Sequence, residues 1–233
     1  MSENVTIDVA QQVEYYRARA NEYDEWWFRK GRYDRGPELN AHWFSDIEQL
    51  DAALREFTPA GKVLELAGGT GIWTEKLYRY ADELTVVDAS AEMLALNEKR
   101  IGSGRVRYIQ ADLLDWAPPE QFDVVFFSFW LSHVPDTKFE PFWSLVRAAV
   151  APAGRVFFID STKDPTSTSP DQVLPKAGPI VERRLNDGRT FNIYKIYYEP
   201  EDLRERLRGL GWNADVGRTS RYFMYGCCYT ADA

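Results

Sequence analysis

The sequence predicts an α/β fold, a doubly wound and mostly parallel sheet of seven strands whose last strand is antiparallel. Between residues 62 and 160, short apolar strand patterns alternate with helical patterns, an order typical of a parallel sheet covered by helices. Residues 122–127 are almost wholly apolar, as expected for a central strand buried on both faces. The last strand pattern, at 215–229, leaves no room for a crossover helix and is therefore expected to pair antiparallel.

Length and composition favour one globular domain. The chain has 233 residues, of which 45% are hydrophobic and 15% aromatic, and this is enough for a single core of ordinary size. No internal repeat and no linker composition divides it.

Two helices are expected before the first strand. In the first, apolar residues recur at steps of three and four on one face, namely Val13, Tyr16, Ala20, Tyr23 and Trp27. The second begins at Pro37 and ends before the stop signal at 58–61. Because the first helix is amphipathic, it has to dock on another part of the protein.

The later elements follow from the same patterns. Strands are expected at 62–66, 84–87, 105–110, 122–127 and 155–160, and helices at 70–80, 90–99 and 138–150. Ser90 is a candidate N-cap. Residues 161–179 form a long loop rich in Ser, Thr and Pro, and a β-rich run at 189–198 precedes a helix that begins at Pro200 and ends near 209–211.

The segment 63–74 combines an apolar strand carrying Glu65, a run of small residues, Ala67, Gly68 and Gly69, and the start of a helical pattern. Small residues let the main chain bend sharply and let a ligand reach backbone N–H groups, and the next helix offers unsatisfied donors. Such a turn can also be only a tight connection. The ends of the other strands have to distinguish the two readings.

Polar residues follow three further strands at the same edge of the predicted sheet. Asp88 ends the second strand, Ala111, Asp112 and Leu113 follow the third, and residues 128–133 follow the fourth. Open α/β sheets bind ligands at the carboxyl ends of their strands. The spacing of Asp88 suits an acidic residue on ribose hydroxyls. The sequence therefore predicts a binding site for an adenosine-containing cofactor.

In order and spacing, these four segments resemble the motifs of class I S-adenosylmethionine-dependent methyltransferases, over roughly the middle half of the chain. The resemblance implies a Rossmann-like sheet and S-adenosyl-L-methionine as cofactor. It also implies three parts in one domain: an N-terminal helical lid at 1–60, a cofactor-binding core at 61–160, and a substrate loop with C-terminal strands at 161–233. Ala67 departs from the pattern, since the family usually has a glycine there, and it has to keep a conformation that an L-residue tolerates.

In that family the turn meets the methionine end of the cofactor, the second acidic residue holds the ribose hydroxyls, and the third contacts adenine. An N-terminal helix often covers the cofactor with a tyrosine. The resemblance thus implies these cofactor contacts: Tyr16, Tyr23, Glu65, Ala67, Gly68, Gly69, Asp88, Ala89, Met93, Ala111, Asp112, Leu113, Ser128 and Phe129. We expect residues 15–28 to form the lid, because aromatic faces suit a sulfonium cation.

Two other functions remain open. An NAD-dependent oxidoreductase fits less well, because its fingerprint needs a glycine where Thr74 stands. Glu65 would also repel a pyrophosphate, whereas it suits the ammonium of the methionine end. The other alternative is a non-catalytic protein that binds S-adenosylmethionine for regulation.

Methyl transfer is an in-line displacement, for which the protein contributes mainly alignment and exclusion of water. His133 is the candidate base, although a hydrogen-bonded structural role at a helix entry is the favoured reading, and His42 is expected to be structural. The candidate substrate residues are Tyr15, Trp26, Trp130 and Tyr194, and with the loop 163–179 they favour a small aromatic or apolar acceptor. Arg183 and Arg184 are either a solvated pair or an anion contact.

The remaining composition argues against other partners. A net charge of −8 makes nucleic acid an unlikely partner, and the first ten residues have no long apolar run that would form a signal peptide or membrane span. The two cysteines, Cys227 and Cys228, are too few for a disulfide framework or zinc cluster. As strand neighbours they should point to opposite faces. We expect a cytoplasmic protein without a metal site.

Overall fold

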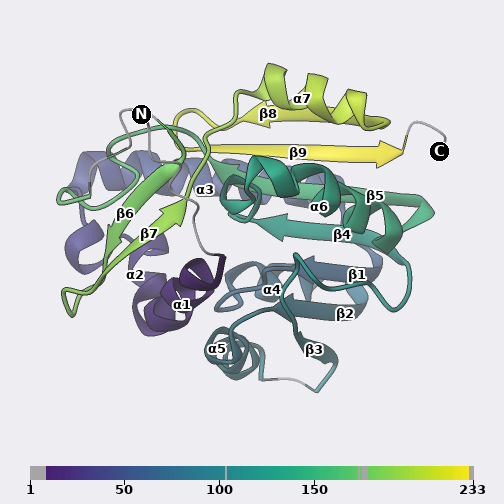
Figure 1. The fold of residues 1–233 in the computed structure, drawn as a ribbon, viewed down its shortest axis with the longest axis horizontal. Helices are drawn as coiled ribbons and strands as arrows, with labels where there is room; N and C mark the ends of the chain where they lie inside the picture. Colours follow the sequence, from purple (N-terminus) through teal and green to yellow (C-terminus); the bar gives the residue numbers. More distant parts are fainter. Residues whose placement is uncertain (1–8, 103, 173, 175–177, 231–233) are drawn as a thin grey trace.

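The computed structural model describes residues 9–102, 104–172, 174 and 178–230. Its main sheet has seven strands in the order β3-β2-β1-β4-β5-β9-β8 (Figure 1). The strands of this sheet are β1 (Gly61–Leu66), β2 (Ala81–Asp88), β3 (Val106–Gln110), β4 (Phe122–Ser128), β5 (Val150–Ser161), β8 (Trp212–Arg218) and β9 (Phe223–Thr230). The first five pair in parallel, and β9 is antiparallel to both β5 and β8. The predicted fold class is confirmed.

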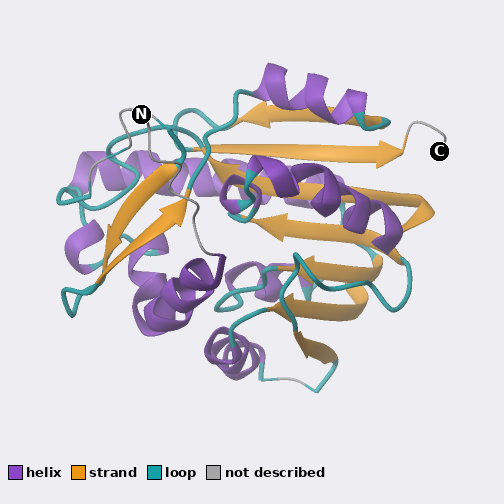
Figure 2. Cartoon of the chain, viewed as in Figure 1, coloured by secondary structure: helices purple, strands orange, loops and turns teal. Residues whose placement is uncertain are grey.

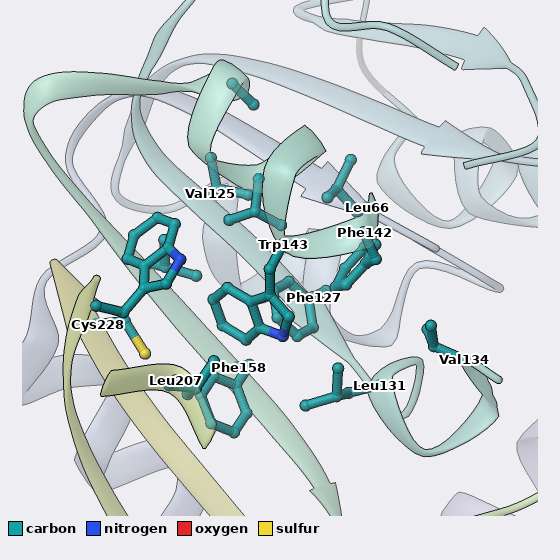
Figure 3. Packing of buried hydrophobic residues seen from close by; sticks show 14 of the residues in the cluster. Leu66, Val125, Phe127, Leu131, Val134, Phe142, Trp143, Phe158, Leu207 and Cys228 are labelled. Atoms are coloured by element: carbon teal, nitrogen blue, oxygen red, sulfur yellow. The ribbon is translucent and has the colours of Figure 1, made fainter. Parts of the chain in front are cut away.

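Helices cover both faces of the sheet (Figures 1 and 2). They are α1 (Val9–Arg19), α2 (Tyr23–Trp27), α3 (Pro37–Phe57), α4 (Ile72–Leu77), α5 (Ala91–Ile101), α6 (Asp136–Ala149) and α7 (Pro200–Gly209). One core cluster joins α6 and α7 to the sheet, and Figure 3 shows Trp143 of α6 against Phe127 and Phe158. A second cluster joins α3, α4 and α5 to the opposite face.

The two cysteines confirm this two-faced arrangement of β9. Cys228 is buried in the cluster with α6 and α7, whereas Cys227 packs against the other cluster. Both thiols are free. Their side chains therefore point to opposite faces, as expected from the alternation of a strand.

The single strand predicted at 215–229 is wrong, because the chain turns there and forms the β8–β9 hairpin. The turn depends on Asp46, a buried residue of α3. Its carboxylate accepts hydrogen bonds from the backbone N–H groups of Arg221 and Tyr222 and from the Thr219 hydroxyl. The partner that stabilises this turn lies far away in the sequence, so local turn signals could not reveal it.

The β-rich run at 189–198 contains β7 (Thr190–Tyr194), which pairs with β6 (Ile180–Arg184) in a separate two-stranded sheet. Sequence reasoning missed β6, because Pro179 and the charged residues within the strand obscure its alternation. Helix α1 packs on this hairpin through Tyr15, which contacts the ring of Phe191. The hairpin and α1 thus form one unit beside the main sheet (Figure 1).

The expected first helix is broken into α1 and α2 by a 3₁₀ turn at Ala20–Glu22. The break lies where the packing partner changes. Helix α1 packs on β7 and α5, whereas Asp24 of α2 accepts a hydrogen bond from the Thr70 hydroxyl at 2.6 Å and pairs with Arg100. Across the part of the chain that the structure describes, no helix is long and apolar enough to cross a bilayer.

Gly226 of β9 lies where Phe158 of β5 crosses it, and an added Cβ would come within 2.3 Å of the ring. Phe158 is fully buried, so the ring cannot give way without disturbing the core. We expect Gly226→Ala to lower the free energy of unfolding by about 1–3 kcal/mol in urea titrations. Gly104→Ala is the control, because its added Cβ meets no described atom within 4 Å. Equal midpoints for the two variants would contradict this packing.

Candidate functional site

The turn after β1 has an unusual backbone. Gly69 and Gly71 have φ of 53° and 89°, and Ala67 has φ of 54°, in the left-handed region that L-residues rarely adopt. Ala67, which was expected to keep a conformation that an L-residue tolerates, therefore has a backbone that few L-residues adopt. At Gly68 a Cβ would lie 2.3 Å from the Val86 side chain. The strand β2 approaches so closely that this position excludes any side chain.

Side chains on both sides stabilise the turn. The N–H of Gly69 donates to Asp88 Oδ2 at 2.9 Å. From beneath, Asn97 of α5 donates to the Gly68 carbonyl at 3.2 Å and to the Thr74 hydroxyl at 2.7 Å. Asn97 was missed from the sequence, since a single buried asparagine in a helix has no pattern that identifies it.

Glu65 lies beneath the turn and does not line the ligand cavities described below. It is 1% exposed and accepts a hydrogen bond from the Thr74 hydroxyl at 2.5 Å. Burial raises the pKa of Glu65 to about 8, more than the Thr74 hydrogen bond lowers it. Glu65 supports the turn through Thr74, and its expected contact with the ammonium of the methionine end stays a prediction.

A first cavity of about 700 Å³, open solvent included, lies above the turn at the carboxyl ends of the strands. Eleven of the residues predicted to contact the cofactor line it: Tyr16, Tyr23, Ala67, Gly69, Asp88, Ala89, Met93, Asp112, Leu113, Ser128 and Phe129. Gly68 lines a smaller adjoining cavity with Thr70. Ala111 and Glu65 line neither. Gln12, Val13 and Ser90 were missed.

The two carboxylates of the first cavity are oriented by backbone donors. Asp88 Oδ1 accepts the N–H of Ser90 at 2.9 Å, and Asp112 Oδ1 accepts the N–H of Leu114 at 3.0 Å. Burial raises the pKa of Asp88, while its backbone hydrogen bonds oppose that shift. Carboxylates held in this way present their remaining lone pairs to hydroxyl or amino donors of a ligand.

Helix α1 closes the first cavity and is bound to the chain after β4, to β7 and to α5. Gln12 donates to the His133 carbonyl at 3.1 Å and accepts the N–H of Tyr194 at 3.2 Å. Arg17 pairs with Glu92 of α5 at 2.7 Å. Gln12 therefore joins the N-terminal helix both to the chain after β4 and to β7.

A second cavity of about 520 Å³, open solvent included, lies between α1, α2 and the β6–β7 hairpin. Tyr16, Tyr23 and Phe129 line both cavities. Of the predicted substrate residues, Tyr15 and Trp26 line the second cavity and Trp130 lines the first. Tyr194 lines neither, because its hydroxyl accepts the N–H of Asp136 at the start of α6.

Polar residues that the sequence did not single out complete the second cavity: Arg19, Ser161, Ser167, Thr168, Gln172 and Lys195. The loop 163–179 contributes three of them, although its residues 173 and 175–177 lie outside the described part. Of the arginine pair, Arg183 is 8% exposed and lines the cavity, whereas Arg184 is exposed.

His133 lines the second cavity, but both of its ring nitrogens are engaged. Nδ1 lies 2.6 Å from the Tyr194 carbonyl, which can only accept, so this nitrogen carries the proton. Nε2 lies 2.8 Å from the Tyr16 hydroxyl and accepts from it. Burial, followed by the positive charge of Lys195, lowers the pKa of His133 well below its usual value. The imidazole is neutral and orients Tyr16. His42 is exposed on α3.

Comparison with known proteins agrees with this geometry. Residues 63–154 match a family model described as a methyltransferase domain. The ubiquinone/menaquinone biosynthesis C-methyltransferase UbiE of Vibrio vulnificus (strain YJ016) is 30% identical over 183 residues, which cover 72% of this chain and 68% of that protein.

Solved structures match over nearly the whole chain. The DhpI–SAH complex is 41% identical with a TM-score of 0.76, covering 97% of this chain and 98% of that one. A DhpI–SAM–HEP complex matches equally well, over 98% and 99%. The 1,6-didemethyltoxoflavin-N1-methyltransferase of Burkholderia thailandensis is 16% identical with a TM-score of 0.65, over 100% and 94%, and shows the shared fold alone.

The buried Glu65 makes stability depend on pH. Its ordinary pKa of 4.5 rises to about 8 in the folded protein. The folded state thus keeps a proton that the unfolded chain releases, so the free energy of unfolding falls as pH rises between these values, by up to about 1.4 kcal/mol per pH unit. We expect Glu65→Gln to flatten this decline in denaturant titrations from pH 5 to 8.

Glu75→Gln, at an exposed position of α4, is the control and should leave the pH dependence as in the wild type. If the curves of Glu65→Gln and the wild type ran parallel over this range, the buried carboxyl would not be the group that titrates.

Proposed function

The chain belongs to the class I S-adenosylmethionine-dependent methyltransferases, and on that premise we propose that it methylates a small molecule held in the second cavity. One observation carries the proposal: Tyr16, Tyr23 and Phe129 line both cavities. A methyl donor in the first cavity and an acceptor in the second would meet at these three side chains. DhpI has been solved in a complex with both SAM and HEP, which supports two adjoining sites in this fold.

The residues of the first cavity fit S-adenosylmethionine. An added Cβ at Gly69 would meet no described atom within 4 Å, so the backbone there is open to a ligand. We assign Asp88 to the ribose hydroxyls, Asp112 with Leu113 to the adenine edge, and the turn to the methionine end. When bound, the cofactor supplies an electrophilic methyl group on a sulfonium. Tyr16, Tyr23 and Phe129 would exclude water around it and align the acceptor.

The Tyr16–His133 pair positions the acceptor and removes no proton from it. Burial, together with neighbouring Tyr15, raises the pKa of the Tyr16 hydroxyl well above its usual value, so the hydroxyl stays protonated. His133 accepts that hydroxyl and has no second lone pair to offer. The acceptor atom, whether oxygen, nitrogen or carbon, therefore has to react without losing a proton to this pair.

Aromatic side chains of the second cavity support an acceptor with a flat or apolar part. The rings of Tyr15, Trp26 and Phe129 line it, and Trp26 is fixed because its indole N–H donates to the Ser167 carbonyl at 2.8 Å. The rigid wall favours a small molecule over a polymer. A radiolabel-transfer screen over small acceptors, with calorimetry on S-adenosylmethionine and its demethylated product, tests this function. Tight binding without transfer to any acceptor would favour the non-catalytic alternative.

The assignment of Asp88 predicts the effect of Asp88→Asn. The amide loses the charge that strengthens hydrogen bonds to the ribose hydroxyls, so we expect at least a tenfold weaker affinity for S-adenosylmethionine by calorimetry. Asp82→Asn, at an exposed position of the same strand, is the control with unchanged affinity. Wild-type affinity in Asp88→Asn would remove the ribose role.

The Tyr16–His133 pair predicts coupled losses. If His133 acts by orienting Tyr16, then Tyr16→Phe and His133→Ala should lower kcat by similar factors, and the double variant should lose little more. The pH dependence of kcat should keep its shape in all three. Loss of one limb of that profile in His133→Ala, with Tyr16→Phe unaffected, would instead make His133 the base.

A further inference from the structure

The second cavity carries an uncompensated positive charge. Among the residues that the structure describes, three cationic side chains line it, Arg19, Arg183 and Lys195, and no Asp or Glu does. Burying a charge in a protein is costly unless a partner of opposite charge or full hydrogen bonding compensates it. What compensates each of these three groups therefore shows how the cavity is used.

Lys195 is compensated within the protein. It is 6% exposed, donates to the Ser132 hydroxyl at 2.6 Å, and lies 3.3 Å from the carboxylate of Asp160, itself 1% exposed. Asp160 is fixed in turn by the N–H groups of Ser132 and Ser161. Lys195 contributes positive potential to the cavity, but its charge already has a partner.

Arg183 and Arg19 have no carboxylate within 4.0 Å among the described residues. Arg183 is 8% exposed and donates a hydrogen bond to the side-chain carbonyl of the neutral Gln172 at 3.1 Å. Arg19 reaches the Tyr33 hydroxyl at 3.5 Å, and its buried Nε has no partner. Its guanidinium lies over the Tyr23 ring at 4.8 Å. Both guanidinium groups thus have unused donors beside the cavity.

Arg29 shows that this arrangement is not the rule for buried arginines here. It is 3% exposed, but its guanidinium donates to the carbonyls of Ser167 and Thr166, at 3.3 and 2.8 Å, and so stabilises the loop that lines the cavity. Within the described part of the chain, neither Arg19 nor Arg183 donates to a backbone carbonyl. Their free donors therefore point to a ligand and not to a structural role.

The positive potential reaches His133 at the back of the same cavity. Lys195, Arg183 and Arg19 each lower the pKa of this imidazole, in addition to its burial. The three cations thus act on one region, next to the side chains Tyr16, Tyr23 and Phe129 that the two cavities share. An anion placed there would compensate the buried charge.

We propose that the acceptor is a small acid, whose anionic group is bound by Arg19 and Arg183 while Tyr15, Trp26 and Phe129 contact the remainder. A guanidinium presents a planar fork of N–H donors. This fork matches the oxygens of a carboxylate and those of a tetrahedral oxyanion, so the site can bind either kind of anionic group. This inference rests on the proposed function and names the substrate class of the same cavity. It narrows the aromatic or apolar acceptor expected from the sequence to one that also carries a negative charge.

The test uses the full chain saturated with S-adenosylhomocysteine. Calorimetry measures binding of two probes, inorganic phosphate for a tetrahedral oxyanion and benzoate for a carboxylate, at constant ionic strength. Benzamide is the neutral counterpart of benzoate. We expect at least one of the two anions to bind. If benzoate is the preferred anion, benzamide should bind at least tenfold more weakly than benzoate. The stronger of the two anions identifies the geometry of the head group.

The variants Arg19→Gln and Arg183→Gln should each weaken binding of the preferred anion at least tenfold, because each loses charged hydrogen bonds. Their affinity for S-adenosylhomocysteine should stay within about threefold of the wild type, which also shows that they fold. Arg184→Gln, on the exposed side of β6, is the matched control with unchanged binding of both ligands.

Failure of this inference differs from failure of the proposed function. If S-adenosylhomocysteine binds but neither phosphate nor benzoate does, or if Arg19→Gln and Arg183→Gln bind the anion as the wild type does, the anion site is refuted and methyl transfer to neutral acceptors stands. If S-adenosylhomocysteine itself does not bind, the proposed function fails. In the radiolabel screen, acids that are no better acceptors than their amides would also refute the anion site.

Discussion

The site depends on the backbone of the turn between β1 and α4. Ala67, Gly69 and Gly71 all have positive φ, a conformation that a short chain does not hold by itself. Asn97 donates to the Gly68 carbonyl from beneath and also to the Thr74 hydroxyl, while Asp88 accepts the Gly69 N–H from above. These contacts stabilise the floor of the cofactor cavity, and Glu65 adds to them by accepting a hydrogen bond from Thr74.

Much of the cofactor cavity could be predicted from the sequence, because the carboxyl ends of parallel strands lie at one edge of the sheet whatever packs around them. The apolar strands placed Asp88, Asp112 and Ser128 beside the turn, and all three line the first cavity. Glu65 shows the limit of that reading. Its place in a motif identified the family, yet its side chain lies below the turn, since the local pattern does not tell on which side of a turn a side chain is buried.

The second cavity could not be predicted in the same way. Arg19 and Lys195 belong to no motif or charge pattern that would mark a binding site in the sequence. They are brought together only when the β6–β7 hairpin packs on α1. The β8–β9 turn was missed for the same reason, because Asp46, which accepts its backbone N–H groups, lies far from it in the sequence. Long-range packing decides these features.

The hydrogen bonds of Gln12 have a kinetic consequence. Helix α1 supplies Val13 and Tyr16 to the first cavity, and Tyr15, Tyr16 and Arg19 to the second. Gln12 and Tyr16 fasten this helix to the chain after β4, and Gln12 also fastens it to β7. Displacing α1 therefore opens the first and the second cavity together, and docking of α1 closes both. Entry and departure of both ligands therefore require the same displacement of α1, so the movement of this helix can limit the rate of the catalytic cycle in place of methyl transfer.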